Sequence, residues 1–166
     1  MSEIIKFHLN GAWISAPDDW LDATDELPKK DRHSKQRIVL QKDDGIGVLN
    51  ISVLRWKYAV QLEHLRGMLM EMCGTFTEEK PFDYIERGSP LMIVAASVVD
   101  GDGVFNRIWY CSDGKMIALV AYTSDEEPHV AEMSECEKIV EDLYFGKKDE
   151  GERDRPPKDE NSSGLN

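Results

Sequence analysis

Two strand-length segments of the sequence, residues 91–99 and 116–121, are apolar at nearly every position. A strand whose two faces are both apolar must be covered on both faces by other parts of the protein. Between them, residues 104–111 form a third apolar segment, which is bounded by short turns rich in Asp and Gly. Turns this short cannot cross over to a parallel partner, so the three segments are predicted to form an antiparallel meander.

Two β-hairpins are predicted before this meander. In the first, apolar and polar residues alternate over 5–9, Asn10-Gly11 suits a two-residue turn, and the chain returns at 12–14. In the second, residues 37–42 and 48–56 flank a turn that contains Gly45. The polar segment 17–35 between the hairpins is long for an ordered loop, and such loops often bind a partner.

Two other segments have the helical hydrophobic period and predict amphipathic helices. The first is predicted near 57–73, and the second near 127–145 with a capping box at Ser124 and Glu127. The apolar face of the first would contain Tyr58, Leu62, Leu65, Leu69 and Met72. The sequence therefore predicts an α+β fold: an antiparallel β-sheet of two N-terminal hairpins plus a C-terminal meander, with helices packed on both faces.

A single globular domain is predicted over residues 1–146, followed by a disordered charged tail over 147–166. The tail contains one large apolar residue, Leu165, which is too little apolar surface to offset the entropy of ordering. The N-terminus has no secretion signal, and no segment has the apolar length of a membrane span. The three cysteines lack metal or disulfide spacing. We therefore expect a cytoplasmic protein with reduced thiols and no membrane partner.

The chain has a formal net charge of −12 at pH 7. Proteins bind the phosphates of nucleic acids through Lys and Arg, so this charge disfavours a nucleic-acid partner. The same charge would steer the chain toward a basic protein.

No catalytic or ligand-binding motif stands out in the sequence. The four histidines lack zinc-site spacing, and the DGDG segment at 100–103 lacks the further acidic ligands of a calcium loop. The glycines match no nucleotide-binding pattern, and no Cys or Ser has neighbours that would activate it as a nucleophile. We therefore predict a non-catalytic protein with no metal and no cofactor.

Acidic residues gather in two parts of the sequence, and each part is a candidate partner-binding surface, although charged runs are usually solvated faces. The first surface is Trp20 with the adjacent acids Asp18, Asp19 and Asp22. There an aromatic anchor would be desolvated while the acids steer a basic partner. The alternative is that Trp20 plugs the edge of the sheet. The second surface consists of three acids near the start of the last helix: Glu126, Glu127 and Glu132.

The opening FHLNGAWISAPDDW and the close NRIWYCSDGKMIALVAYTSDEEPHVAEMSECEKIVEDLYF resemble the PsbP-like fold family. The opening is similar to the family's strand, turn, strand and Pro-x-x-Trp entry. Residues 139–145 are similar to its closing helix signature, with Asp142 where Ser is usual. The resemblance spans residues 5–145 and implies an antiparallel α+β fold.

This family hosts several unrelated functions, so the fold alone does not select one. Small acidic bacterial members resemble immunity proteins, which neutralise a cognate toxin delivered by type VI or contact-dependent secretion. The resemblance thus implies a toxin with a basic cleft as the partner. Two alternatives stay open: an acidic chaperone or adaptor for a secreted effector, and a PsbP-like domain that binds a small ligand. The sequence leaves the oligomeric state open.

Overall fold

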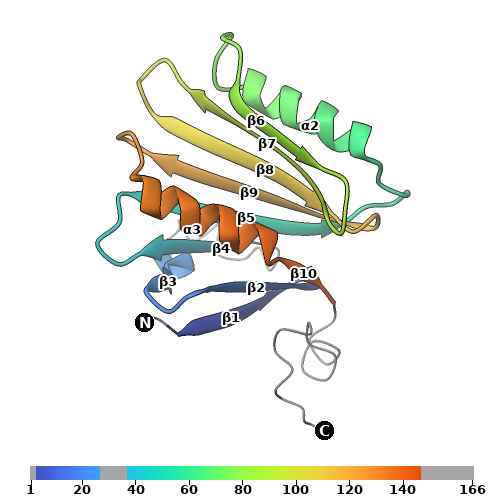
Figure 1. Ribbon diagram of the computed structural model, residues 1–166, viewed down its shortest axis with the longest axis horizontal. Coiled ribbons are helices and arrows are strands. Elements are labelled where there is room, and N and C mark those ends of the chain that lie inside the picture. The colour runs from blue at the N-terminus through green and yellow to red at the C-terminus, as the bar shows by residue number, and fades with distance from the viewer. Residues whose placement is uncertain (1–2, 27–36, 147–166) are drawn as a thin grey trace, which may run out of the picture.

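The computed structural model of the chain describes residues 3–26 and 37–146 (Figure 1). The tail predicted at 147–166, and residues 27–35 of the polar segment 17–35, lie outside the described residues.

The main sheet has seven strands in the order β3-β4-β5-β9-β8-β7-β6. Each neighbouring pair is antiparallel, which confirms the predicted antiparallel α+β class. The second hairpin and the meander supply its centre. The strands are β3 (Trp20–Asp22), β4 (Arg37–Lys42), β5 (Gly47–Arg55), β6 (Phe82–Arg87), β7 (Met92–Val99), β8 (Phe105–Ser112) and β9 (Met116–Ser124).

The first hairpin does not join this sheet, in contrast to the single sheet that the sequence predicts. Strands β1 (Ile4–Leu9) and β2 (Ala12–Pro17) pair with β10 (Tyr144–Phe145) in a separate sheet of order β1-β2-β10. Residues 144–145, which are predicted to end the last helix, are therefore extended. A short 3-10 helix, η1 (Thr24–Glu26), follows β3.

The main sheet buries a hydrophobic core on each of its faces, because successive side chains of a strand point to opposite sides. On one side, α2 (Leu62–Gly74) packs Leu65 and Leu69 against Val94 of β7 and Ile108 of β8. On the other side, the core combines α3 (Val130–Glu141) with the small sheet, as shown by Ile139 and Ile14 in one cluster with Trp109. The chain is mostly strands, and a β-sheet supplies much of the cover that helices are predicted to supply.

Both helices begin later than the sequence predicts, and tertiary contacts explain the difference. Residues 56–60 are held against the turn between β8 and β9, where Trp56 N donates to the Lys115 carbonyl at 2.9 Å. Tyr58 is accordingly 72% exposed instead of belonging to the apolar face of α2. Ser124 ends β9 and pairs with Gly47, so the predicted capping box is wrong and His129 is the N-cap of α3.

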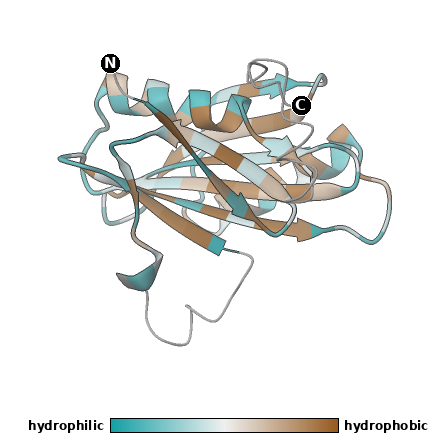
Figure 2. Cartoon of the chain, turned by 90° about the horizontal axis from the view of Figure 1, so that it is seen from below, coloured by the Kyte–Doolittle hydropathy of each residue, from teal (hydrophilic) through white to brown (hydrophobic). Residues whose placement is uncertain are grey.

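In Figure 2, hydrophobic residues (brown) are concentrated on the strands, and the turns that join the strands are mostly hydrophilic (teal). No helix of the described residues is both long enough and apolar enough to cross a bilayer.

The position of Leu69 in the core between α2 and the sheet leads to a stability prediction. Leu69 is fully buried, and its neighbour Met70 is 50% exposed. Leu69→Ala should lower the free energy of unfolding by about 2–5 kcal/mol, because it removes buried methyl groups and leaves a cavity. Met70→Ala should lower it by less than about 1 kcal/mol. Urea denaturation of both variants measures this, and equal losses would contradict the placement of α2.

Candidate functional site

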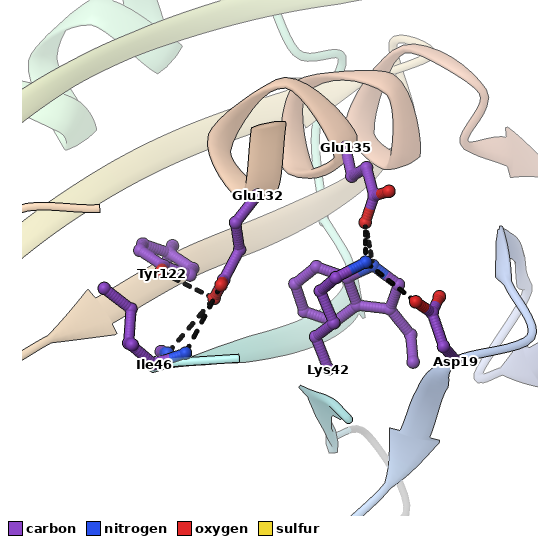
Figure 3. Close-up of polar contacts among 8 residues, drawn as sticks. Asp19, Lys42, Ile46, Tyr122, Glu132 and Glu135 are labelled. Carbon is purple, nitrogen blue, oxygen red and sulfur yellow. Dashed lines mark hydrogen bonds and ion pairs between the residues drawn. The ribbon is translucent and has the colours of Figure 1, made fainter. Parts of the chain in front are cut away.

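At the predicted surface around Trp20, a buried indole lies beneath a partly exposed polar network of Asp19, Lys42 and Glu135 (Figure 3). The Trp20 side chain is fully buried, and its Nε1 donates to Glu135 Oε1 at 2.8 Å. Lys42 Nζ donates to the same Glu135 oxygen at 2.7 Å and to Asp19 Oδ2 at 2.8 Å. Trp20 is therefore not exposed to a partner. Its buried position agrees with the alternative that Trp20 plugs the edge of the sheet.

Lys42 on β4 connects two other elements: the loop before β3, through Asp19, and the helix α3, through Glu135. Burial by itself lowers the pKa of Lys42, but the hydrogen bonds to Asp19 and Glu135 outweigh this effect and raise the pKa above its ordinary value. Lys42 thus stays protonated and neutralises carboxylates of two separate elements. Asp19 is occupied by this contact, whereas Asp18 and Asp22 are exposed.

Glu132 is also an internal residue and is not part of a free acidic surface. Its side chain accepts hydrogen bonds from Tyr122 Oη at 2.7 Å, Gly47 N at 3.1 Å and Ile46 N at 3.3 Å (Figure 3). Glu132 is only 3% exposed. Burial, followed by the hydrogen bond to Glu132, raises the pKa of Tyr122, so this phenol remains a donor. Glu132 therefore fixes α3 to β9 and to the turn between β4 and β5.

Glu126 and Glu127 are exposed, as predicted, in the connection between β9 and α3. The strand register brings this connection together with two turns, because Ser124 pairs with both Gly47 and Phe105. The loop before β3 joins the same end through the bond from Asp43 N to the Asp19 carbonyl, at 2.7 Å. We call this the acidic end, at the left in Figure 1. Its exposed acids are Asp18, Asp43, Asp44, Asp102, Asp125, Glu126 and Glu127.

An open groove of about 650 Å³ adjoins the acidic end, between the edge strand β6 and the start of α3. Its walls are largely apolar and partly exposed: Phe82 and Tyr84 on β6 are 43% and 47% exposed, and Val130 on α3 is 86% exposed. Glu127 lies on its rim. We call this the β6 groove; it places apolar side chains next to exposed carboxylates.

Arg107 lines the β6 groove, and its Nε and Nη1 atoms bond other residues of the protein. Its Nε donates to Glu137 Oε2 at 2.9 Å, and its Nη1 donates to the Asp83 carbonyl at 2.7 Å and to Ser97 Oγ at 3.0 Å. Asp83 has a φ of +55° within an irregularity of β6 that turns its carbonyl toward Arg107. These bonds occupy Nε and Nη1 of the guanidinium, and the walls of the groove are largely apolar.

The opposite end of the sheets holds a surface that the sequence reasoning missed. Arg55, Trp56, Lys57, Tyr58 and Lys115 line an open depression of about 770 Å³ where β5 leads to α2. We call these five residues the basic-aromatic platform. Its signal in the sequence is the run Arg-Trp-Lys-Tyr directly after a strand of an acidic protein. The sequence analysis places Trp56 at the end of a strand and Tyr58 on the apolar face of the first helix, so it does not predict that these residues are exposed.

The three cysteines, Cys73, Cys111 and Cys136, are buried and form no disulfide. Burial raises the pKa of each thiol, so each is predominantly protonated near neutral pH. Among residues 3–26 and 37–146, no group of three or more His, Cys, Asp or Glu side chains is placed to hold a metal ion.

Comparison with family models and with curated proteins finds no match for this chain. Among solved structures, the chain is similar to a crystal structure of a protein from Bacteroides thetaiotaomicron, with a TM-score of 0.55 and 14% identity. The likeness covers 90% of this chain and 50% of that protein, so the chain spans about half its length. At this identity the likeness shows the fold alone.

The internal position of Glu132 leads to a prediction that separates structural from free acids. Glu132→Ala should lower the free energy of unfolding by about 2–4 kcal/mol, because it leaves the Tyr122 hydroxyl and two backbone N–H groups without their acceptor. Glu126→Ala removes an exposed acid six residues earlier and should change it by less than about 0.5 kcal/mol. Chemical denaturation measures both, and a neutral effect of Glu132→Ala would refute its role as an anchor.

Proposed function

We propose that this chain is a non-catalytic binding protein, and specifically a cytoplasmic immunity protein that neutralises a cognate secreted toxin by direct contact. The observation that carries the proposal is the juxtaposition of the acidic end with the β6 groove. Exposed acids such as Glu126 and Glu127 would attract a basic cleft and raise the association rate. Binding energy requires apolar anchors that lose water, and Phe82, Tyr84 and Val130 supply them next to these acids.

The proposal differs from the sequence prediction in the residues that bind. Trp20 and Glu132 are internal, and Asp19 is paired with Lys42. Of the predicted acids, Asp18, Asp22, Glu126 and Glu127 are exposed. The resemblance to the PsbP-like family, whose small acidic bacterial members resemble immunity proteins, supports the same proposal and suggests the class of partner.

A second candidate function, a domain that binds a small apolar ligand, is favoured by the size of the β6 groove. Ligand pockets usually have volumes of about 300–1,000 Å³, and this groove has about 650 Å³. Tight small-ligand sites also present a few convergent polar groups. Here Arg107 already bonds Glu137, Ser97 and the Asp83 carbonyl through Nε and Nη1, and this favours a protein partner over a small ligand.

The test uses the product of the gene next to that of this chain, co-expressed with the chain in a bacterial host. The double variant Glu126→Lys/Glu127→Lys should slow association about tenfold at low salt, because it reverses the charge at the rim of the groove. Stopped-flow mixing at about 0.05 M and 0.5 M salt measures this, and the difference should shrink at the higher concentration as the charges are screened.

The matched control is Glu63→Lys/Glu71→Lys, which makes the same charge change at exposed positions on α2. This control should leave association and protection of the host within about twofold of the wild type, since α2 lies on the other face of the sheet. The proposal fails if no neighbouring gene product binds the chain. It also fails if the α2 control slows association as much as the reversal beside the groove.

A further inference from the structure

The basic-aromatic platform combines side chains that are unusual on the surface of an acidic protein. Tyr58 is 72% exposed and Trp56 is 39% exposed, and they lie between the exposed cations Arg55, Lys57 and Lys115. Trp, Tyr and Arg are the residues most enriched among those that dominate binding energy at protein interfaces. Large exposed aromatic side chains on a folded protein also leave apolar surface in contact with water.

The backbone beneath the platform is held in place before any partner arrives. Trp56 N donates to the Lys115 carbonyl at 2.9 Å, and Val60 N donates to the Gly114 carbonyl at 2.8 Å. The β8–β9 turn is itself fixed by Asp113 Oδ1, which accepts from the backbone N of Lys115 at 2.9 Å. A platform tied at both ends loses little conformational entropy on binding.

The cations of the platform lack acidic partners within the described part of the chain, although the protein is rich in acids. Five described cations elsewhere form ion pairs with carboxylates: Lys42, Arg66, Arg87, Arg107 and Lys138. Arg55, Lys57 and Lys115 form no such pair with residues 3–26 or 37–146. Among the residues that line the depression, Asp113 is the acid, and its Oδ1 accepts backbone N–H bonds.

We propose that the basic-aromatic platform is a second interaction surface, which binds an acidic segment of another protein. In such a segment, Asp or Glu side chains would pair with Arg55, Lys57 and Lys115. An apolar or aromatic side chain of the segment would pack on Trp56 and Tyr58. The surface lies at the other end of the sheets from the acidic end, so this inference is independent of the proposed immunity function (Figure 1).

The net negative charge of the whole protein favours a short acidic segment over an extended polyanion as the partner of the platform. A nucleic acid or an anionic bilayer would extend past the three cations and meet a chain of net charge −12. A short acidic segment meets only the platform. A second copy of this chain could offer its own acidic end, but such head-to-tail contacts produce open chains or rings.

The test uses a synthetic peptide in which Leu and Phe are flanked on each side by three Glu residues. Titration followed by NMR should shift the backbone signals of residues 55–59 and 115 and the indole N–H signal of Trp56. Affinity should fall as salt is added. Trp56→Ala and Lys57→Glu should each weaken binding about tenfold, because one removes the stacking surface and the other reverses a central charge.

The matched control is Lys80→Glu, which makes the same charge change at an exposed position outside the platform. It should leave the affinity within about twofold of the wild type. The circular dichroism melting curve of each variant establishes that it is folded. The same peptide with Lys in place of every Glu should not bind.

Three results would overturn the proposal. The first is the absence of shifts at the platform with the acidic peptide. The second is binding of a single-stranded oligonucleotide or phosphatidylserine vesicles at the platform more tightly than the acidic peptide. The third is salt-sensitive self-association in sedimentation velocity that Lys57→Glu abolishes, which would identify a second copy of the chain as the occupant.

Discussion

The fold depends on three glutamates of α3 that point toward the main sheet and tie this helix to strands from the β3 edge to β8. Glu132 accepts from Tyr122 and from the turn before β5, Glu135 accepts from Trp20 and Lys42, and Glu137 accepts from Arg107 and Trp109. These contacts reach β3, β4, β5, β9 and β8. Hydrogen bonds to an ionised carboxylate are stronger than those between neutral groups, so α3 is fixed over strands that are remote in the sequence.

This arrangement divides the acids of the chain into two populations with different consequences for function. Glu132, Glu135 and Glu137 bond other residues of the protein, and Arg107 bonds Glu137 in the same network. The outward acids collect where the β4–β5 and β7–β8 turns meet the start of α3, beside the apolar β6 groove. Arg55, Lys57 and Lys115, which form no ion pair with the described part of the chain, lie together at the other end. The molecule therefore presents two chemically different surfaces, and each proposal uses one of them.

Local patterns predicted most of the strands, because alternation and turn chemistry are properties of neighbouring residues. The hairpin at Asn10-Gly11 and the meander after residue 91 both follow from such patterns. Local patterns did not predict three features: the separate small sheet, the exposure of Tyr58 and the burial of Glu132. Each is decided by contacts between distant segments, for example Tyr144 with Trp13 or Glu132 with Tyr122. A glutamate in an acidic helix looks the same in sequence whether it faces water or a buried tyrosine.

The contact between Glu137 and Arg107 tests the central claim most directly, because Arg107 is 4% exposed and joins α3 to β8. A double-mutant cycle compares unfolding free energies of the wild type, Arg107→Ala, Glu137→Ala and the double variant in urea. We predict that the double variant loses less stability than the sum of the single losses, by about 1–3 kcal/mol. Additivity of the two losses within about 0.3 kcal/mol would show that the contact between Glu137 and Arg107 does not help to hold α3, which would contradict this account.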